Sequence, residues 1–199
     1  MKKIIISAIV VLIAMNSIAQ TQVSDGSSVH LTFKSVPIDG TLSEYVLNMT
    51  KNGFTHIGTE DGIATLKGDF AAYKGCTVVV ATMKQKDLVS KITVIFPECD
   101  TWSTLSSNYF SLKEMLTEKY GKPSDSVEKF QTDLQPKDDN MKMYEVKLDR
   151  CKYSTAFESE KGSIQLSIEH DGVAQCFVML AYYDKINGNS IRAKAIDDL

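Results

Sequence analysis

Three short clusters in the sequence carry side chains that can do chemistry. The first, Glu98-Cys99-Asp100, follows a predicted strand and combines a thiol with two carboxylates on a loop, where site residues often lie. Two adjacent carboxylates raise the pKa of a thiol, which is the wrong direction for a nucleophile. Asp100 is also a residue type that caps helices, and a helix is predicted to follow it. We therefore favour a helix cap here, and a hydrolase with a site near residues 98–102 is an alternative.

The second cluster, His170-Asp171-Gly172, offers an acid-base pair, but Asp-Gly between two predicted strands is a turn signal. His56 lies in a short predicted strand and is interpreted as a sheet-surface residue. No histidine stands near a cysteine at the spacing of metal ligands, and the common catalytic, nucleotide-binding and calcium-binding motifs do not occur. We therefore predict no catalytic residue, no metal ligand and no cofactor.

The third cluster is aromatic. Trp102, Tyr182 and Tyr183, with Asp184, can form a platform for a sugar or a partner protein, because large aromatic side chains anchor interfaces. An alternating face of Phe177, Met179, Ala181 and Tyr183 is more often the buried face of a strand, and we favour that interpretation. Both interpretations stay open, and these four residues are the predicted binding residues.

Four cysteines, Cys76, Cys99, Cys151 and Cys176, have two interpretations. In an oxidising compartment they form disulfides, and pairing within each half would join Cys76 to Cys99 and Cys151 to Cys176. Alternatively they are small buried hydrophobic residues, as free cysteines often are. Their spacing does not choose between the two.

Residues 1–19 have the pattern of a secretory signal. Lys2 and Lys3 precede an apolar run over residues 4–15, which is shorter than the roughly 20 residues that span a bilayer. Ser17 and Ala19 are small residues at the positions that signal peptidase recognises, and no cysteine follows for lipid attachment. We predict cleavage after Ala19, no membrane insertion of the mature chain and a periplasmic or secreted location.

Cleavage there leaves 180 of the 199 residues, enough for one sizeable domain or two small ones sharing a core. Removing the two lysines of the signal leaves 20 basic against 25 acidic residues, a formal charge of −5. Binding to phosphate backbones depends on clustered Lys and Arg. The charge therefore argues against nucleic acid as a partner.

Periodicity predicts a helix followed by about four strands, twice in succession. The helices are expected over residues 41–52, with a Thr41/Glu44 capping box, and over 101–120. A strand is expected from 29 to 37. Residues 141–150 fit either a helix or a strand, and we favour a short helix because residues 138–140 can cap its N-terminus. The remaining predicted strands cover 54–58, 63–67, 76–83, 88–96, 127–131, 151–158, 163–170 and 175–183.

These elements divide the chain into a flexible leader (20–28), a first repeat (29–98), a second repeat (99–184) and a polar tail (185–199). The predicted fold class is α+β, an antiparallel sheet with helices on one face, built from two helix-plus-four-strand repeats. The other face of the sheet is then either solvated or a binding surface.

Residues 29–184 resemble a group of small exported proteins of Bacteroides-type bacteria, on the segments LTFKSVPIDG (31–40), LKEMLTEKYGKP (112–123) and AYYDKIN (181–187). The resemblance implies a compartment and no chemistry. Asp125-Ser126-Val127 is similar to the O-glycosylation acceptor of such proteins, with Ser126 as the attachment site. The plan of elements is also similar to the TATA-box-binding-protein-like and β-lactamase-inhibitor-protein-like folds, and a shared fold does not carry a function.

Together these observations predict an exported, non-enzymatic binding or accessory module of the cell envelope that holds a protein or a glycan. Two alternatives remain: the periplasmic hydrolase already described, which requires a deep pocket with converging polar groups, and a structural surface component, which requires a patch for self-association.

Overall fold

The computed structural model describes residues 28–83, 86–172 and 174–197. The predicted signal sequence and all but the last residue of the predicted leader lie outside the described residues. The helices are α1 (Leu42–Lys51), α2 (Trp102–Tyr120), α3 (Asp139–Lys147) and α4 (Lys185–Asp197). The strands are β1 (Thr32–Phe33), β2 (Val36–Pro37), β3 (Thr55–Glu60), β4 (Ile63–Phe70), β5 (Tyr73–Met83), β6 (Lys86–Ile95), β7 (Asp125–Phe130), β8 (Cys151–Glu158), β9 (Gly162–Asp171) and β10 (Gln175–Asp184).

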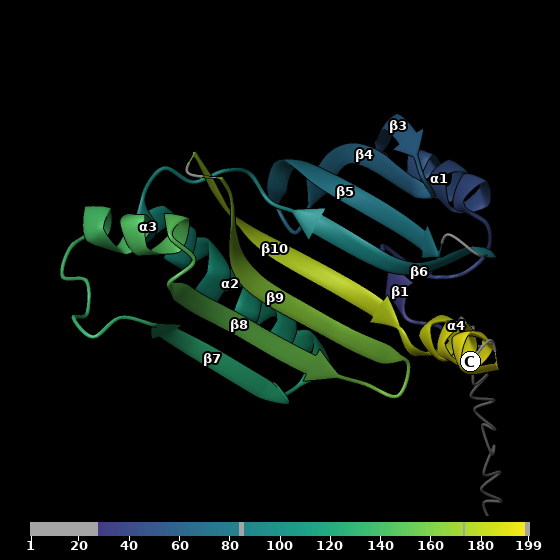
Figure 1. Cartoon of the computed structure of the whole chain (residues 1–199). Coiled ribbons are helices and arrows are strands. Elements are labelled where there is room, and N and C mark those ends of the chain that lie inside the picture. The colour runs from purple at the N-terminus through teal and green to yellow at the C-terminus, as the bar shows by residue number, and fades with distance from the viewer. Residues whose placement is uncertain (1–27, 84–85, 173, 198–199) are drawn as a thin grey trace, which may run out of the picture.

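Eight of these strands form one antiparallel sheet in the order β3-β4-β5-β6-β10-β9-β8-β7. Two meanders, β3 to β6 and β7 to β10, therefore meet through their last strands (Figure 1). The predicted α+β class with a large antiparallel sheet is confirmed. Each meander follows a helix, as the repeat hypothesis requires. The second half also contains α3 between β7 and β8, whereas no helix lies at the corresponding place between β3 and β4. The duplication and its boundaries stay predictions.

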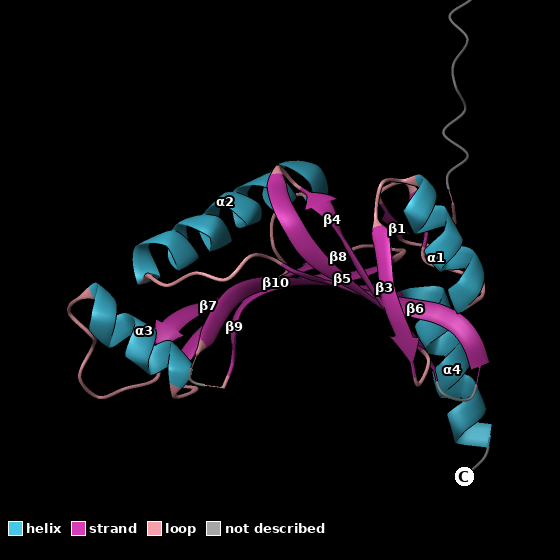
Figure 2. Cartoon of the chain, turned by 90° about the horizontal axis from the view of Figure 1, so that it is seen from above, coloured by secondary structure: helices cyan, strands magenta, loops and turns pink. Residues whose placement is uncertain are grey.

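The helices α1 and α2 lie on the same side of the sheet, which curves away from them (Figure 2). α1 contacts β4, β5 and β6, and α2 contacts β8, β9 and β10. Alternate strand residues such as Leu66, Val78, Val94, Leu166 and Leu180 are buried beneath these helices. The opposite face of the sheet, here called the open face, has neither α1 nor α2 on it.

Local signals place both helix starts. Glu44 and Thr41 form the predicted capping box: the Glu44 amide donates to Thr41 Oγ1 at 3.3 Å, and the Thr41 amide donates to Glu44 Oε2 at 3.2 Å. The predicted cap of α2 by Asp100 is wrong by one residue. Thr101 is the cap, and its hydroxyl accepts from the Thr104 amide at 3.3 Å. The short helix predicted within 141–150 is present as α3, capped by Asp138.

The strand predicted from 29 to 37 is instead a tight hairpin of β1 and β2. Its two turn residues, Lys34 and Ser35, have φ values of 50° and 64°, the left-handed conformation of a two-residue hairpin turn. The fold-back inserts Phe33 into the core beside Phe70 and Tyr182, with ring centroids 5.0 and 5.4 Å away. Period-2 alternation alone did not reveal the turn, because neither residue is glycine or asparagine.

The end of β10 is fastened by a buried polar cluster. Asp184, 2 % exposed, accepts from the Leu31 amide at 2.8 Å, from the Asn187 amide at 2.9 Å and lies 3.1 Å from His30 Nδ1. The Asn187 side-chain amide donates to the carbonyls of Ile38 and Val89. These bonds join the N-terminal segment, β6, β10 and the start of α4.

Candidate functional site

The predicted binding residues are not brought together on one surface. Trp102 and Tyr182 are buried in the core, where Trp102 packs against Phe130. Asp184 belongs to the buried cluster at the end of β10. Only Tyr183 lies on the open face, with Lys91 Nζ 4.9 Å from its ring centroid. An aromatic platform of these four residues is therefore not formed, because alternate residues of a strand point to opposite faces.

The cluster at Glu98-Cys99-Asp100 is also divided by burial. Glu98 and Asp100 are exposed, whereas Cys99 is 6 % exposed and accepts from Asn108 Nδ2 at 3.4 Å. Burial raises the pKa of the Cys99 thiol, and the Asn108 bond offsets this in part. Within the described residues neither His56 nor His170 is hydrogen-bonded to Cys99. The thiol therefore has neither the base nor the low pKa that a nucleophile needs.

His170 lies at the end of β9, where its Nδ1 is 2.8 Å from the Gly172 carbonyl and its Nε2 is 3.7 Å from Asp149. Gly172 has a φ of 56°, consistent with the predicted Asp-Gly turn. His56 Nε2 lies 2.9 Å from Thr59 Oγ1 on the exposed edge strand β3.

All four cysteines are present as thiols. The Cys99 amide donates to the Cys176 carbonyl at 2.8 Å, so the backbone neighbour of Cys99 lies in the other half of the chain. The pairing within each half stays a prediction. Ser126, the predicted glycosylation site, is exposed on edge strand β7, where its hydroxyl contacts Lys113 Nζ at 3.1 Å and Thr155 Oγ1 at 3.1 Å.

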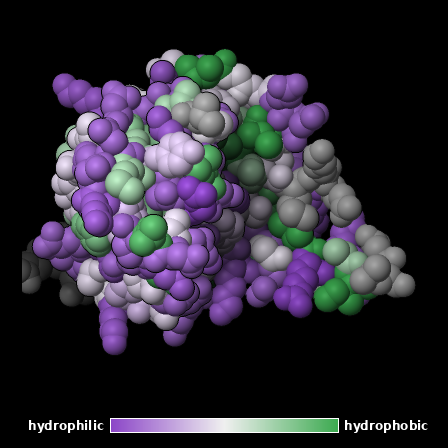
Figure 3. All heavy atoms as spheres, turned by 60° about the vertical axis from the view of Figure 1, so that its left-hand side comes forward, coloured by the Kyte–Doolittle hydropathy of each residue, from purple (hydrophilic) through white to green (hydrophobic). Residues whose placement is uncertain are grey.

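The open face is the side of the sheet opposite α1 and α2. One row of paired residues crosses its centre and consists of small and uncharged side chains, namely Thr65, Val79, Thr93, Ala181, Gln165 and Ala156. Lysines stand in neighbouring rows, Lys67 on β4 and Lys91 on β6. Figure 3 turns the α3 and β7 side of the molecule forward and shows a mostly hydrophilic surface with apolar patches beside it in a hollow. The centre of the open face is uncharged but includes polar side chains, and lysines stand beside it.

The sheet is interrupted at one seam. β8 and β9 are paired from Glu158 and Ser163 only as far as Ser154 and Ser167. Beyond that point β8 stays paired with β7, and β9 stays paired with β10, so the separation is confined to this seam. In Figure 1, β9 and β10 turn upwards past α3 and away from β8. We call this opening the β8–β9 wedge.

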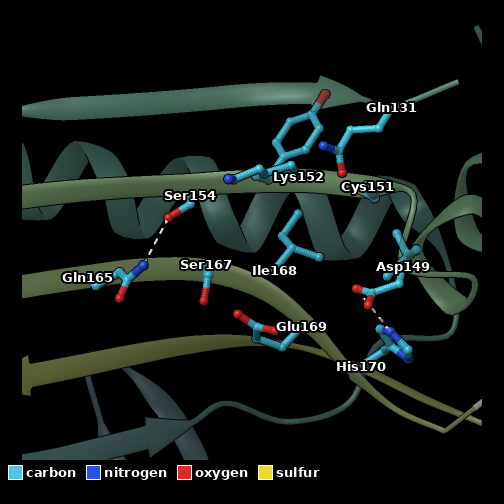
Figure 4. A pocket seen from close by; sticks show the side chains of 12 residues that line it. Gln131, Asp149, Cys151, Lys152, Ser154, Gln165, Ser167, Ile168, Glu169 and His170 are labelled. Atoms are coloured by element: carbon cyan, nitrogen blue, oxygen red, sulfur yellow. Dashed lines mark hydrogen bonds and ion pairs between the residues drawn. The ribbon is translucent and has the colours of Figure 1, made fainter.

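The wedge forms a pocket of about 250 Å³. Polar side chains of the open face line it (Figure 4), namely Lys152 and Ser154 from β8 and Gln165, Ser167 and Glu169 from β9. Val146 of α3 and Ile168 also line it, so the pocket reaches from the open face towards α3. Figure 4 shows β9 turning away from β8 beyond Ser167.

The polar groups of the wedge are incompletely paired. Gln165 Nε2 donates to Ser154 Oγ at 3.3 Å. The Ser167 hydroxyl, on a residue only 4 % exposed, has no hydrogen-bond partner among the described residues. Buried polar groups normally have a hydrogen-bond partner, so a buried hydroxyl without one is expected to bind a group that the chain does not supply. Sequence reasoning missed this site because the separation of two strands depends on the placement of α3, which lies between β7 and β8 in the chain.

No protein-family model, curated protein or solved structure matches this chain. Across residues 28–83, 86–172 and 174–197, no helix is long and apolar enough to cross a membrane. The same residues contain no group of three or more His, Cys, Asp or Glu side chains arranged to hold a metal ion.

Proposed function

We propose that this protein is an exported, non-enzymatic binding module of the cell envelope that holds a protein or a glycan on the open face of its sheet. The observation that carries the proposal is the open face itself: eight paired strands with α1 and α2 on the other side. At a strand spacing of about 4.8 Å, eight strands extend across roughly 34 Å. With strands about 20 Å long, the face measures roughly 700 Å², close to the approximately 800 Å² that one partner contributes to a standard interface.

The residue types of the face support binding over catalysis. Half-buried Thr93 and Val79 at its centre need little desolvation, and Lys67 and Lys91 near them supply directional polar contacts. The curvature seen in Figure 2 makes the face concave, which increases the contact area with a rounded partner.

The hydrolase alternative has less support. Glu98 lines a pocket of about 290 Å³ at the edge of the open face, together with Lys67 and Asp171. No serine, cysteine or histidine lines that pocket, and the Cys99 thiol points into the core. A hydrolytic site requires a positioned nucleophile or general base, whereas the Glu98 and Asp171 carboxylates of this pocket are exposed to solvent.

The test is a pulldown from the native envelope with the mature chain as bait and mass spectrometry of what is retained. Thr93→Arg places a long charged side chain at the centre of the face, and we expect it to reduce retention of the partner at least tenfold. Ser107→Arg, on the exposed side of α2, is the matched control and should retain the partner at the wild-type level.

If both variants retain the partner equally, the open face is not the binding surface. A hydrolase substrate panel run on wild type and Cys99→Ser separates the enzyme alternative, which requires turnover that the substitution abolishes. Light scattering of the purified chain addresses the structural alternative, since a surface component of that kind self-associates.

A further inference from the structure

We propose that the β8–β9 wedge is a subsite for a neutral, hydroxylated ligand of about the size of one sugar ring. This inference rests on the proposed function: for a glycan partner, it places one sugar ring in the wedge on the open face. Four observations on the wedge carry it: the broken seam, the orphaned Ser167 hydroxyl, the balance of charge and the volume.

The broken seam supplies hydrogen-bonding backbone. In a continued ladder, Tyr153 would pair with Ile168 and Lys152 with Glu169, but the pairing ends at Ser154 and Ser167. The facing edges of the two strands therefore line a pocket instead of bonding to each other. Each edge carries both N–H donors and C=O acceptors, and such groups need partners when they are shielded from water. A ligand that both donates and accepts matches this lining.

Ser167 gives the wedge a directional contact. Ser167 lines the pocket, and its buried hydroxyl has no hydrogen-bond partner among the described residues, so a ligand hydroxyl that reaches it gains a hydrogen bond that the protein does not already make. Ser154 uses its oxygen to accept from Gln165, which leaves its own O–H free to donate, and the Gln165 carbonyl oxygen can accept. The three side chains present donors and acceptors within one short stretch of two strands.

The charges in the wedge do not select an ion. Lys152 and Glu169 both line it, and Asp149 at its outer end faces His170 at 3.7 Å with a side chain that is 94 % exposed. A phosphate or carboxylate site would instead gather Arg and Lys around one point. The apolar residues Val146 and Ile168 on the inner side suit the C–H face of a ring.

The volume fixes the size class. A space of about 250 Å³ holds about eight water molecules at roughly 30 Å³ each, which is the room that one hexose ring needs. At about 0.3 kcal/mol for each of about 12 non-hydrogen atoms, the affinity of a single ring is on the order of 1 mM. A longer glycan gains further contacts along the open face, so the isolated sugar is a probe of the subsite and not of the whole partner.

The experiment is a titration of the isotope-labelled mature chain with glucose, galactose, mannose and N-acetylglucosamine to about 20 mM, followed by amide chemical shifts. At least one neutral sugar is expected to shift the amides of Tyr153, Ser154 and Ser167 to Glu169 in a saturable manner. Glucuronate and glucosamine, the charged counterparts, are expected to bind at least fivefold more weakly.

Two variants separate binding from folding. Ser167→Ala removes the orphaned hydroxyl, and we expect about fivefold weaker binding with an unchanged or higher melting temperature, because no internal hydrogen bond is lost. Ser163→Ala, on the same face of β9 but outside the pocket, is the matched control and should bind like wild type.

The proposal is overturned if no neutral sugar produces saturable shifts, if Ser167→Ala binds as well as Ser163→Ala, or if a charged counterpart binds more tightly. A fall in the melting temperature of Ser167→Ala would show that the hydroxyl is structural, and that also overturns it. Loss of sugar binding leaves the pulldown with Thr93→Arg unaffected, so failure of the subsite is distinguishable from failure of the open face.

Discussion

The two halves of the sheet have the same order of strands but differ at one seam. In the first half, β4, β5 and β6 are paired across the centre of the sheet, and the register shifts lie near the strand ends and on the edge strand β3. In the second half, α3 is inserted between β7 and β8, and the β8–β9 seam opens beside it. The opening that we assign to a ligand therefore lies where the second half departs from the first.

The helices α1 and α2 also differ in the hydrogen bonding of their buried tyrosines. Tyr45 of α1 is 1 % exposed, and its hydroxyl has no hydrogen-bond partner among the described residues. Tyr109 of α2 is fully buried, and its hydroxyl lies 2.5 Å from Thr155 Oγ1 and 3.3 Å from Glu128 Oε1. The first half thus uses tyrosine as an apolar ring, and the second uses it as part of a polar network.

The last strands of the halves end differently as well. β6 continues through a partly exposed loop into α2, whereas β10 ends in the buried cluster of Asp184 and Asn187. That cluster contacts Leu31, Ile38 and Val89, which come from the first half of the chain. The joint between the halves therefore depends on polar bonds as well as on the β6–β10 ladder.

The largest effect is expected from breaking this joint. Asp184→Ala leaves the amides of Leu31 and Asn187 buried without an acceptor, at about 1–3 kcal/mol each. We expect the free energy of unfolding to fall by about 3 kcal/mol in urea denaturation. Asp171→Ala, at the exposed opposite end of the β9–β10 hairpin, is the control and should change it by less than about 0.5 kcal/mol. Similar losses in both variants would contradict the role of the cluster.

Much of this architecture follows from local signals, and the joint does not. The Thr41/Glu44 capping box and the Asp138 cap act within one turn of chain, so the sequence predicts α1 directly and favours a helix over a strand at α3. The meander strands follow from alternation, because each pairs with its neighbour in sequence. Asp184, by contrast, bonds to Leu31 across 153 positions, and no local pattern distinguishes it from a surface carboxylate.

The candidate site could be predicted only in part. The polar alternation of Ser163, Gln165, Ser167 and Glu169 marks one face of a strand as open to solvent. The orphaned state of Ser167 and the separation of β8 from β9 depend on α3 and on the neighbouring strands, so they are properties of the assembled fold. The aromatic residues misled the prediction because Trp102 and Tyr182 are as useful to a core as to a binding surface.

A smaller effect, of opposite sign in the two halves, is expected from removing the tyrosine hydroxyls. Tyr109→Phe leaves Thr155, which is fully buried, with fewer partners, and we expect a loss of about 1.5 kcal/mol in the free energy of unfolding. Tyr45→Phe removes a hydroxyl that has no partner among the described residues, so stability should stay the same or rise by up to about 1 kcal/mol. The two variants serve as controls for each other. Equal losses in the free energy of unfolding would show that the Tyr45 hydroxyl is hydrogen-bonded in solution.

The smallest effect concerns pH and compares one thiol from each half. Burial, with smaller contributions from Cys176 and Glu145, raises the pKa of Cys151 from 9.0 to about 12, and burial also raises the pKa of Cys76. Above pH 9 the unfolded chain releases the Cys151 proton while the folded chain keeps it, so the folded state binds more protons and the free energy of unfolding falls as pH rises.

The thiol's contribution to stability is fully present below pH 9 and is lost progressively between about 9 and 12. One proton per molecule corresponds to at most about 1.4 kcal/mol per pH unit, and because Cys151 is only partly buried we expect about 1 kcal/mol between pH 9 and 10. Cys151→Ala should flatten the curve of unfolding free energy against pH over that interval, measured with a reductant present. Cys76→Ala should flatten it less, because the pKa of Cys76 is raised by a smaller amount. If the curves of Cys151→Ala and wild type differ only by a constant offset, the Cys151 thiol is solvated in the native protein. The second half is then more open beside the wedge than its strand pairing indicates.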